Sequence, residues 1–348
     1  MENLHMVSYA TEIARLSDSS IGVLYYSMRR SGKTVYGISD GYWDTTENNE
    51  SVFPIQSKTA PDAKKVFKKL VDSWKRLPKY WRPEDGGATE VKSSLEFSER
   101  RRITKIGEKR EYREVLNSTI YFVSSSETAN DGDRTTYQVT DEIGKVDPPL
   151  DVNERHNINK ECVLRGTTIL GFIYAASTIE DFEKFAAEEA QTLWNRSDSR
   201  KRLPDGFTDS GLFRIFLPAS IGLEGTDVNG QPFVDEWGYS DIKSTKAHIL
   251  SMYQAKKGKD QLSYRRKYPL TIDDSFALAS GGNNYSKERL MSQMKYNTES
   301  SPSPWIRGNF TWLNGVRDTE VIWQPDPEGR WMAGWFPKQE DRESKRLP

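Results

Sequence analysis

The sequence predicts an α/β fold with a mostly parallel central sheet and helices on both faces. Short continuous apolar runs alternate with amphipathic stretches of helical period, and the two kinds of segment follow one another regularly. A run that is apolar throughout is typical of a strand buried on both faces, as in a parallel sheet. We expect a core at 1–218, a small C-terminal lid or linker subdomain at 219–280, and a linker with a β-hairpin at 281–348.

Individual elements can be placed along the chain. The expected strands are residues 21–26, 51–55, 90–97, 118–123, 136–140, 168–177 and 212–217, with helices at 59–77, 181–196 and 244–256. The run at 168–177 is the longest, so we expect it to be a central strand. Pro54 weakens the prediction for 51–55 because proline cannot donate a ladder hydrogen bond. The segment PDPEG, between 321–324 and 330–334, predicts a hairpin turn.

Composition excludes several classes of protein. The chain has 348 residues, of which 35 % are hydrophobic and 29 % charged, but its 10 Trp, 16 Tyr and 14 Phe supply enough apolar area for a core. No apolar stretch is long enough to span a membrane, and the N-terminus lacks the pattern of a secretory signal. One cysteine and three scattered histidines argue against a disulfide or a zinc site. We expect a soluble intracellular protein without a membrane partner.

Charge is unevenly distributed along a chain whose net charge is only −1. Residues 64–113 carry 16 Lys and Arg against 8 Asp and Glu, so this segment is strongly basic. Such asymmetry indicates a face for an anionic partner, although a solvated surface explains the charge more simply. The candidate DNA-binding residues in this segment are Lys92, Arg100, Arg101, Arg102, Lys105, Lys109 and Arg110.

A phosphate-binding loop is predicted at the end of the first strand. Its residues are Ser27, Met28, Arg29, Arg30, Ser31, Gly32, Lys33 and Thr34. The pattern is that of a loop ending in Gly-Lys-Thr before a helix, except that Ser27 replaces the first glycine. In this chemistry Gly32 lets backbone N–H groups approach phosphate oxygens, Lys33 spans the β- and γ-phosphates, and the Thr34 hydroxyl ligates Mg²⁺. The expected ligands are therefore ATP and Mg²⁺.

An acidic pair completes the predicted catalytic site. Asp141 and Glu142 directly follow the strand at 136–140. A phosphate-loop ATPase needs one carboxylate for the metal and another to activate the attacking water. We assign Asp141 to Mg²⁺ and Glu142 to the water. A phosphate-loop NTPase fold of the RecA-like type follows from both motifs together.

Further residues are candidates for supporting roles. Arg29 lies inside the loop and could reach the γ-phosphate as an arginine finger, or form a plain salt bridge. Arg134 is a second finger candidate, acting on a neighbouring subunit. Ser177 and Thr178 end the long strand, where they could sense the γ-phosphate or simply cap the next helix.

The ordered set of motifs resembles the large terminase subunit of tailed bacteriophages. The loop SMRRSGKT, the strand TYQVTDE and the strand ending in AAST carry the resemblance, together with QSKTAPDAKKVF and RRKYPLTIDDSFAL. The resemblance covers roughly residues 21–278. It implies roles for Arg29, Lys33, Thr34, Asp141 and Glu142 as above, and a coupling role for Ser177-Thr178. Members carry an adenine-contacting glutamine before the loop, whereas no glutamine precedes Ser27.

This resemblance implies an ATP-driven motor that translocates double-stranded DNA into a viral procapsid. The implied partners are the portal protein, the small terminase subunit and further copies of the chain in a ring, in the host-cell cytoplasm and transiently at the procapsid portal. We expect no nuclease activity, because only a tryptophan-rich lead-in to the family's nuclease domain follows residue 281. Two alternatives remain: a helicase-like translocase, and a non-catalytic DNA-binding assembly module.

Overall fold

A computed structural model describes residues 2–83, 91–98, 116–124, 126, 129–143, 151–178, 184–276, 293, 296 and 306–334. The chain divides into two units, Met1–Ala277 and Leu278–Pro348. Among the helices that the structure describes, none is long and apolar enough to cross a membrane.

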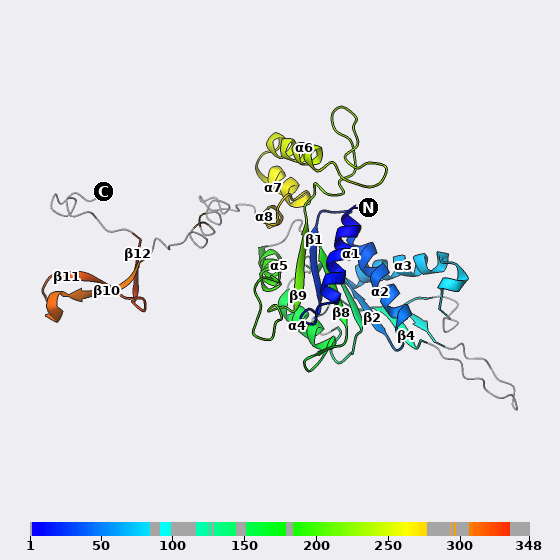
Figure 1. Cartoon of the computed structure of the whole chain (residues 1–348), viewed down its shortest axis with the longest axis horizontal. Helices are drawn as coiled ribbons and strands as arrows, with labels where there is room; N and C mark the ends of the chain where they lie inside the picture. The colour runs from blue at the N-terminus through cyan, green and yellow to red at the C-terminus, as the bar shows by residue number, and fades with distance from the viewer. Residues whose placement is uncertain are drawn as a thin grey trace. The chain divides into compact units, whose positions relative to one another are not determined.

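A seven-stranded sheet forms the centre of the first unit (Figure 1). Its spatial order is β3 (Ser94–Phe97), β4 (Ser118–Phe122), β2 (Val52–Gln56), β5 (Tyr137–Asp141), β8 (Phe172–Ser177), β1 (Gly22–Ser27) and β9 (Leu212–Leu217). All neighbouring strands are parallel except β3, which runs antiparallel to β4 at the edge. Because the strands are parallel, the ends of β1, β5 and β8 meet at one edge of the sheet, where ligands bind in such folds.

Helices cover both faces of this sheet, which confirms the predicted fold class. α1 (Glu2–Arg15), α2 (Lys33–Glu47) and α3 (Ala60–Arg76) lie on one face, and α4 (Val152–Cys162) and α5 (Lys184–Arg196) lie on the other. Alternate residues of β1 belong to the two cores: Val23 and Tyr25 face the first group of helices, and Leu24 and Tyr26 face the second. Both faces of the central strands are therefore buried, as the continuous apolar runs predicted.

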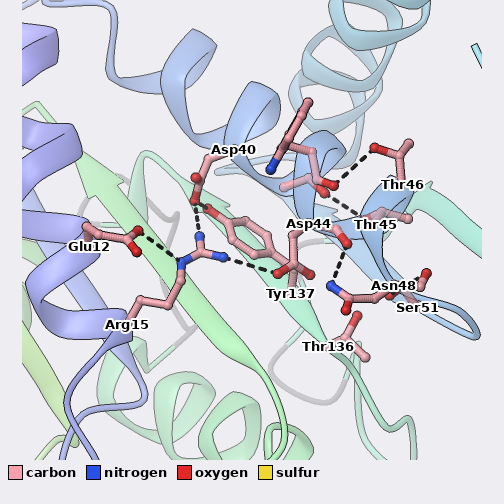
Figure 2. Close-up of polar contacts among 12 residues, drawn as sticks. Glu12, Arg15, Asp40, Asp44, Thr45, Thr46, Asn48, Ser51, Thr136 and Tyr137 are labelled. Carbon is pink, nitrogen blue, oxygen red and sulfur yellow. Dashed lines mark hydrogen bonds and ion pairs between the residues drawn. The ribbon is translucent and has the colours of Figure 1, made fainter. Parts of the chain in front are cut away.

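An ion-pair cluster ties α1 to α2 and to the sheet (Figure 2). The Arg15 guanidinium lies 2.6 Å from Asp40 Oδ2 and 3.1 Å from Asp44 Oδ1. The Tyr137 hydroxyl donates a 2.6 Å hydrogen bond to the same Asp40 oxygen. Burial raises the pKa of both carboxyl groups, and the Arg15 charge opposes that rise. These contacts fix α1 against α2, the helix that follows the predicted loop.

Three helices follow β9 at the carboxyl edge of the sheet. They are α6 (Ile242–Ala255), α7 (Gly258–Lys267) and α8 (Ile272–Ser275). α6 contributes Ile249 and Tyr253 to a small core that also buries Met28 and Ala219. α8 begins with a capping box in which the Thr271 side chain accepts from the Asp274 backbone. This group of helices thus packs directly on the segment that joins β1 to α2.

Two sequence-based expectations about strands are wrong. The run at 168–177 is not one strand: β7 (Thr168–Ile169) pairs with β6 (Leu164–Arg165), and β8 starts at Phe172. Gly171 separates them, packed so closely on the Thr135 carbonyl that a Cβ would lie 2.3 Å from its oxygen. Pro54, in contrast, is accommodated inside the sheet, because β5 registers with β2 only at Ile55 and Gln56.

The second unit contains a small antiparallel sheet. Its strands are β10 (Ile306–Trp312), β11 (Val321–Pro325) and β12 (Trp331–Ala333), in the order β11-β10-β12. The segments on either side of PDPEG are therefore not paired with each other, and the predicted hairpin is wrong. β10 lies between them and bonds to both, because it is long enough to register Gly308–Trp312 with β11 and Ile306–Gly308 with β12.

Candidate functional site

The candidate site begins with the turn between β1 and α2, residues 27–34. Gly32 adopts φ 81°, a left-handed conformation that suits glycine, immediately before α2 starts at Lys33. A Cβ on Gly32 would lie 2.9 Å from Leu4 of α1, so the close packing of α1 also requires glycine. Ser27 replaces the usual first glycine, and its hydroxyl lies 2.6 Å from the Ser31 hydroxyl across the turn. The turn is closed by these side chains and places the N-terminus of α2 at the sheet edge.

The Lys33 ammonium lies inside the turn, and the residue is 5 % exposed. The ammonium donates a 3.3 Å hydrogen bond to the Met28 carbonyl and another to the Thr178 hydroxyl. Met28 and Thr178 stand at the ends of neighbouring strands, because Tyr26 of β1 registers with Ser177 of β8. The ammonium is therefore held where the turn and the end of β8 meet.

Asp141 lies close to Thr34, as the two motifs predict. β5 ends at Asp141 on the other side of β8, and the Thr34 hydroxyl donates a 2.8 Å hydrogen bond to Asp141 Oδ1. Burial and the neighbouring Glu142 carboxylate raise the pKa of Asp141 to about 6, while Thr34, Lys33 and Lys69 oppose the rise. A carboxylate beside a hydroxyl supplies the oxygen ligands that Mg²⁺ prefers. Thr34 and Asp141 therefore fit a magnesium ion.

Glu142 faces the end of β8. Its backbone adopts φ 54°, which is uncommon for a residue other than glycine. One carboxylate oxygen accepts from the Thr178 backbone N–H at 3.3 Å and from the Ser177 hydroxyl at 3.5 Å, and the other accepts from the Thr178 hydroxyl at 3.5 Å. Ser177 and Thr178 are fully buried. Thr178 thus contacts Lys33 on one side and Glu142 on the other.

Most of the predicted site residues come together. The residues of the turn, Ser27, Met28, Ser31, Gly32, Lys33 and Thr34, meet Asp141, Glu142, Ser177 and Thr178 at one sheet edge. Arg29 and Arg30 belong to the same turn and are exposed, with Arg30 at φ 61°.

Other candidates lie elsewhere or outside the described residues. Arg134 is exposed and precedes β5, so it stands at the amino edge of the sheet, opposite Asp141. It cannot reach the site of its own chain without crossing the length of the strand. Lys92 lies just before the edge strand β3. Arg100, Arg101, Arg102, Lys105, Lys109 and Arg110 lie outside the described residues.

Two further residues support the turn and were not predicted. The buried Tyr174 hydroxyl of β8 donates a 3.1 Å hydrogen bond to the Lys33 carbonyl. The Asn3 side chain of α1 donates a 2.9 Å hydrogen bond to the Ser31 carbonyl. Nothing in the sequence marks either residue, because Tyr174 lies in an apolar run and Asn3 lies in a segment without a recognisable motif.

Comparisons with known proteins agree with the fold. No family model and no curated protein matches the chain. The ATPase domain of the large terminase of Thermus phage P74-26 is a similar solved structure, with 14 % identity over 74 % of this chain and 90 % of that chain, at a TM-score of 0.42. The large terminase of another thermophilic bacteriophage, solved in complex with ADP, has 15 % identity, 72 % and 48 % coverage, and a TM-score of 0.38. The match spans about half the length of this second terminase, and both proteins belong to the family that the sequence motifs resemble.

Proposed function

We propose that the chain is the ATP-hydrolysing motor domain of a viral terminase large subunit, which drives double-stranded DNA into a procapsid. The observation that carries the proposal is the meeting of Lys33, Thr34, Asp141, Glu142 and Thr178 at one sheet edge. These residues supply a cation for phosphate, oxygen ligands for a metal and a base for water, which are the parts that phosphoryl transfer to water requires.

Each residue of the site takes one role. Lys33 exchanges its bonds to Met28 and Thr178 for the β- and γ-phosphate oxygens of ATP, and the N–H groups of the turn bind the same phosphates. Mg²⁺, held by Thr34 and Asp141, would neutralise charge on the β- and γ-phosphates. Glu142 orients the attacking water and accepts its proton. Arg29 stabilises charge on the γ-phosphate in the transition state.

Thr178 links the γ-phosphate position to the catalytic base. Its hydroxyl contacts the Lys33 ammonium and its backbone N–H contacts the Glu142 carboxylate. When Lys33 turns to the phosphates, Thr178 loses one partner while it still holds the other. Ser177 and Thr178 therefore serve as the coupling motif that reports nucleotide occupancy to the end of β8.

The motor assignment goes beyond ATP hydrolysis. It rests on the ordered motifs and on the basic segment that follows β2, since a translocating motor must contact phosphate groups of any sequence. In this proposal residues 219–280 form a lid over the nucleotide, 281–348 lead towards a nuclease domain, and the portal protein, the small subunit and further copies of the chain are the partners. Arg134, at the far edge of its own sheet, would act as a finger only on a neighbouring copy.

Measurement of ATP hydrolysis tests this function directly. We expect Mg²⁺-dependent hydrolysis that Lys33→Ala reduces by on the order of 10²-fold or more, since it removes the cation that faces the phosphates. Lys201→Ala, which removes an exposed lysine after α5, is the matched control and should keep wild-type turnover. Wild-type turnover in the Lys33 variant would refute the proposed site. Stimulation of turnover by duplex DNA of unrelated sequences is the result expected of a motor, and its absence would favour a different ATPase.

A further inference from the structure

The outward side of α3 is strongly basic. Its buried stripe, formed by Ala63, Val66, Phe67, Leu70, Val71 and Trp74, packs on the sheet. The opposite side exposes six cations, which we call the basic face: Lys64, Lys65, Lys68, Lys69, Lys75 and Arg76. From Thr59 to Arg82 the chain has eight Lys and Arg against two Asp, so this short stretch carries +6 while the whole chain carries −1. The rest of the protein is acidic and repels a polyanion.

Few acidic partners neutralise this basic face. Lys65 pairs with Asp62 at 3.0 Å, and Lys58 approaches the same carboxylate at 3.9 Å. Within the described part of the chain, no ion pair involves Lys64, Lys68 or Lys75. Their charges face solvent and are available to a partner.

Two exposed aromatic rings extend the basic face at its C-terminal end. The 3₁₀ helix η1 (Lys79–Trp81) follows α3 and leaves Tyr80 79 % exposed and Trp81 64 % exposed. Their rings meet edge to face with centroids 5.8 Å apart. The Tyr42 hydroxyl donates to the Trp81 carbonyl at 3.3 Å, and Arg82 donates to the Lys75 carbonyl at 3.4 Å. Backbone contacts thus hold this turn in place while its large side chains stay in solvent.

We propose that the basic face of α3, with Tyr80 and Trp81 at its end, binds the phosphate backbone of double-stranded DNA. Lys64, Lys68 and Lys75 lie within a narrow stripe along the helix, because steps of four and seven residues return close to the same direction. The stripe is about 17 Å long at 1.5 Å per residue, and a duplex presents about ten phosphate charges over that length. The two rings pack against deoxyribose at the edge of the same contact.

The basic face also reaches towards the catalytic site. α3 begins directly after the carboxyl end of β2, at the edge of the sheet where Asp141 lies. Lys69 is close enough for its charge to oppose the raised pKa of the Asp141 carboxyl group. DNA bound along α3 would therefore lie next to the residues that hydrolyse ATP. This inference rests on the proposed function for its choice of duplex DNA as the partner.

Binding of a fluorescently labelled duplex of mixed sequence, without ATP and over a series of salt concentrations, tests the inference. The triple variant Lys64→Gln, Lys68→Gln, Lys75→Gln should bind about tenfold more weakly or worse, and its salt slope should fall by about 2 to 3, since each phosphate contact contributes about 0.9. The matched control Lys201→Gln, Lys243→Gln, Lys257→Gln makes the same charge change at exposed positions and should change affinity less than about twofold. Trp81→Ala should also weaken binding.

Several outcomes would overturn this inference. They are absence of duplex binding by the wild type, equal losses in the triple variant and its control, binding of single strands alone, and binding of anionic phosphatidylserine vesicles in place of DNA. Thermal unfolding of both triple variants verifies that they are folded, and the single changes Lys64→Gln and Lys68→Gln replace the triple variant if it is not. ATP hydrolysis without DNA is measured separately. A wild type that hydrolyses no ATP but loses duplex binding in the triple variant would refute the proposed function and leave this inference standing.

Discussion

Thr34 and Asp141 are 107 residues apart in the sequence, yet the Thr34 hydroxyl donates a 2.8 Å hydrogen bond to Asp141 Oδ1. The contact exists because β1 and β5 flank β8 in a parallel sheet and end at the same edge. It brings the hydroxyl that follows the phosphate-binding turn to the carboxylate that ends the acidic strand. The proposed metal site depends on this relationship.

Asp141→Asn should uncouple nucleotide binding from Mg²⁺. The amide keeps the shape of the side chain and can still accept from Thr34, but it lacks the negative charge that attracts a divalent cation. We expect the Mg²⁺ concentration for half-maximal hydrolysis to rise about 10- to 100-fold, as with other changes at metal sites. A titration of hydrolysis against Mg²⁺ measures the effect. An unchanged requirement for Mg²⁺ would show that the metal binds elsewhere.

Glu142→Gln should bind ATP without hydrolysing it. The amide can keep a hydrogen bond to the Thr178 backbone but cannot accept the proton of the attacking water. We expect the single-turnover rate to fall by about 10²- to 10⁴-fold, the usual contribution of a general base. Retention of labelled ATP on the protein after gel filtration provides the second readout. Rapid hydrolysis by this variant would assign the base to another residue.

Gly37→Ala should destabilise the protein although alanine favours helices. A Cβ at this position in α2 would lie 2.4 Å from the Tyr174 ring, which is fully buried and bonded to the Lys33 carbonyl. Overpacking of this kind costs about 1–3 kcal/mol, against a gain in helix propensity of about 1 kcal/mol. We expect a net loss in the free energy of unfolding, measured by chemical denaturation. Ser39→Ala, on the exposed side of α2, is the control and should shift stability by less than about 0.5 kcal/mol.

His156 should make the fold sensitive to acid. It is buried in α4, bonded to the Ser210 carbonyl at 2.8 Å, and burial lowers its pKa to about 4. The neutral ring is favoured in the folded state, so its contribution is complete above the unfolded pKa of about 6.5 and is lost as the pH falls towards 4. The predicted loss is about 3 kcal/mol across this window.

The comparison that isolates this effect uses His156→Gln, whose side chain does not titrate. Denaturation of both proteins at about pH 7.5 and about pH 4.5, on either side of the unfolded pKa, cancels the carboxylates that they share. We expect the variant to lose less stability than the wild type between the two values. Equal losses in the two proteins would mean that His156 is protonated without cost in the fold.

Sequence reasoning predicted the strands well where burial on both faces makes them apolar throughout. The runs that became β1 and β9 lie at the predicted places, and the helix at 59–77 corresponds to α3, capped by Thr59. Two helices were missed because their buried sides are half polar. α1 buries Asn3 and Thr11 with Val7 and Ala14, and α4 buries Arg155, His156 and Asn159. A helical period of apolar residues is absent from both segments, so no periodicity could indicate them.

The site was more predictable than the surroundings that hold it. Lys33, Thr34, Asp141 and Glu142 belong to local patterns whose chemistry is recognisable within a few residues. Tyr174 and Asn3 act through single hydrogen bonds to the backbone of the turn, and their positions depend on how β8 and α1 pack. Contacts of this kind are fixed by the tertiary structure and leave no pattern in the sequence.

A structure of the protein with a non-hydrolysable ATP analogue and Mg²⁺ tests the central claim most directly. The account predicts the triphosphate in the turn at 27–34, the Lys33 ammonium moved from Thr178 to within about 3 Å of phosphate oxygens, and the metal between Thr34 and Asp141. A triphosphate bound away from the turn, with the contact between Lys33 and Thr178 intact, would contradict it.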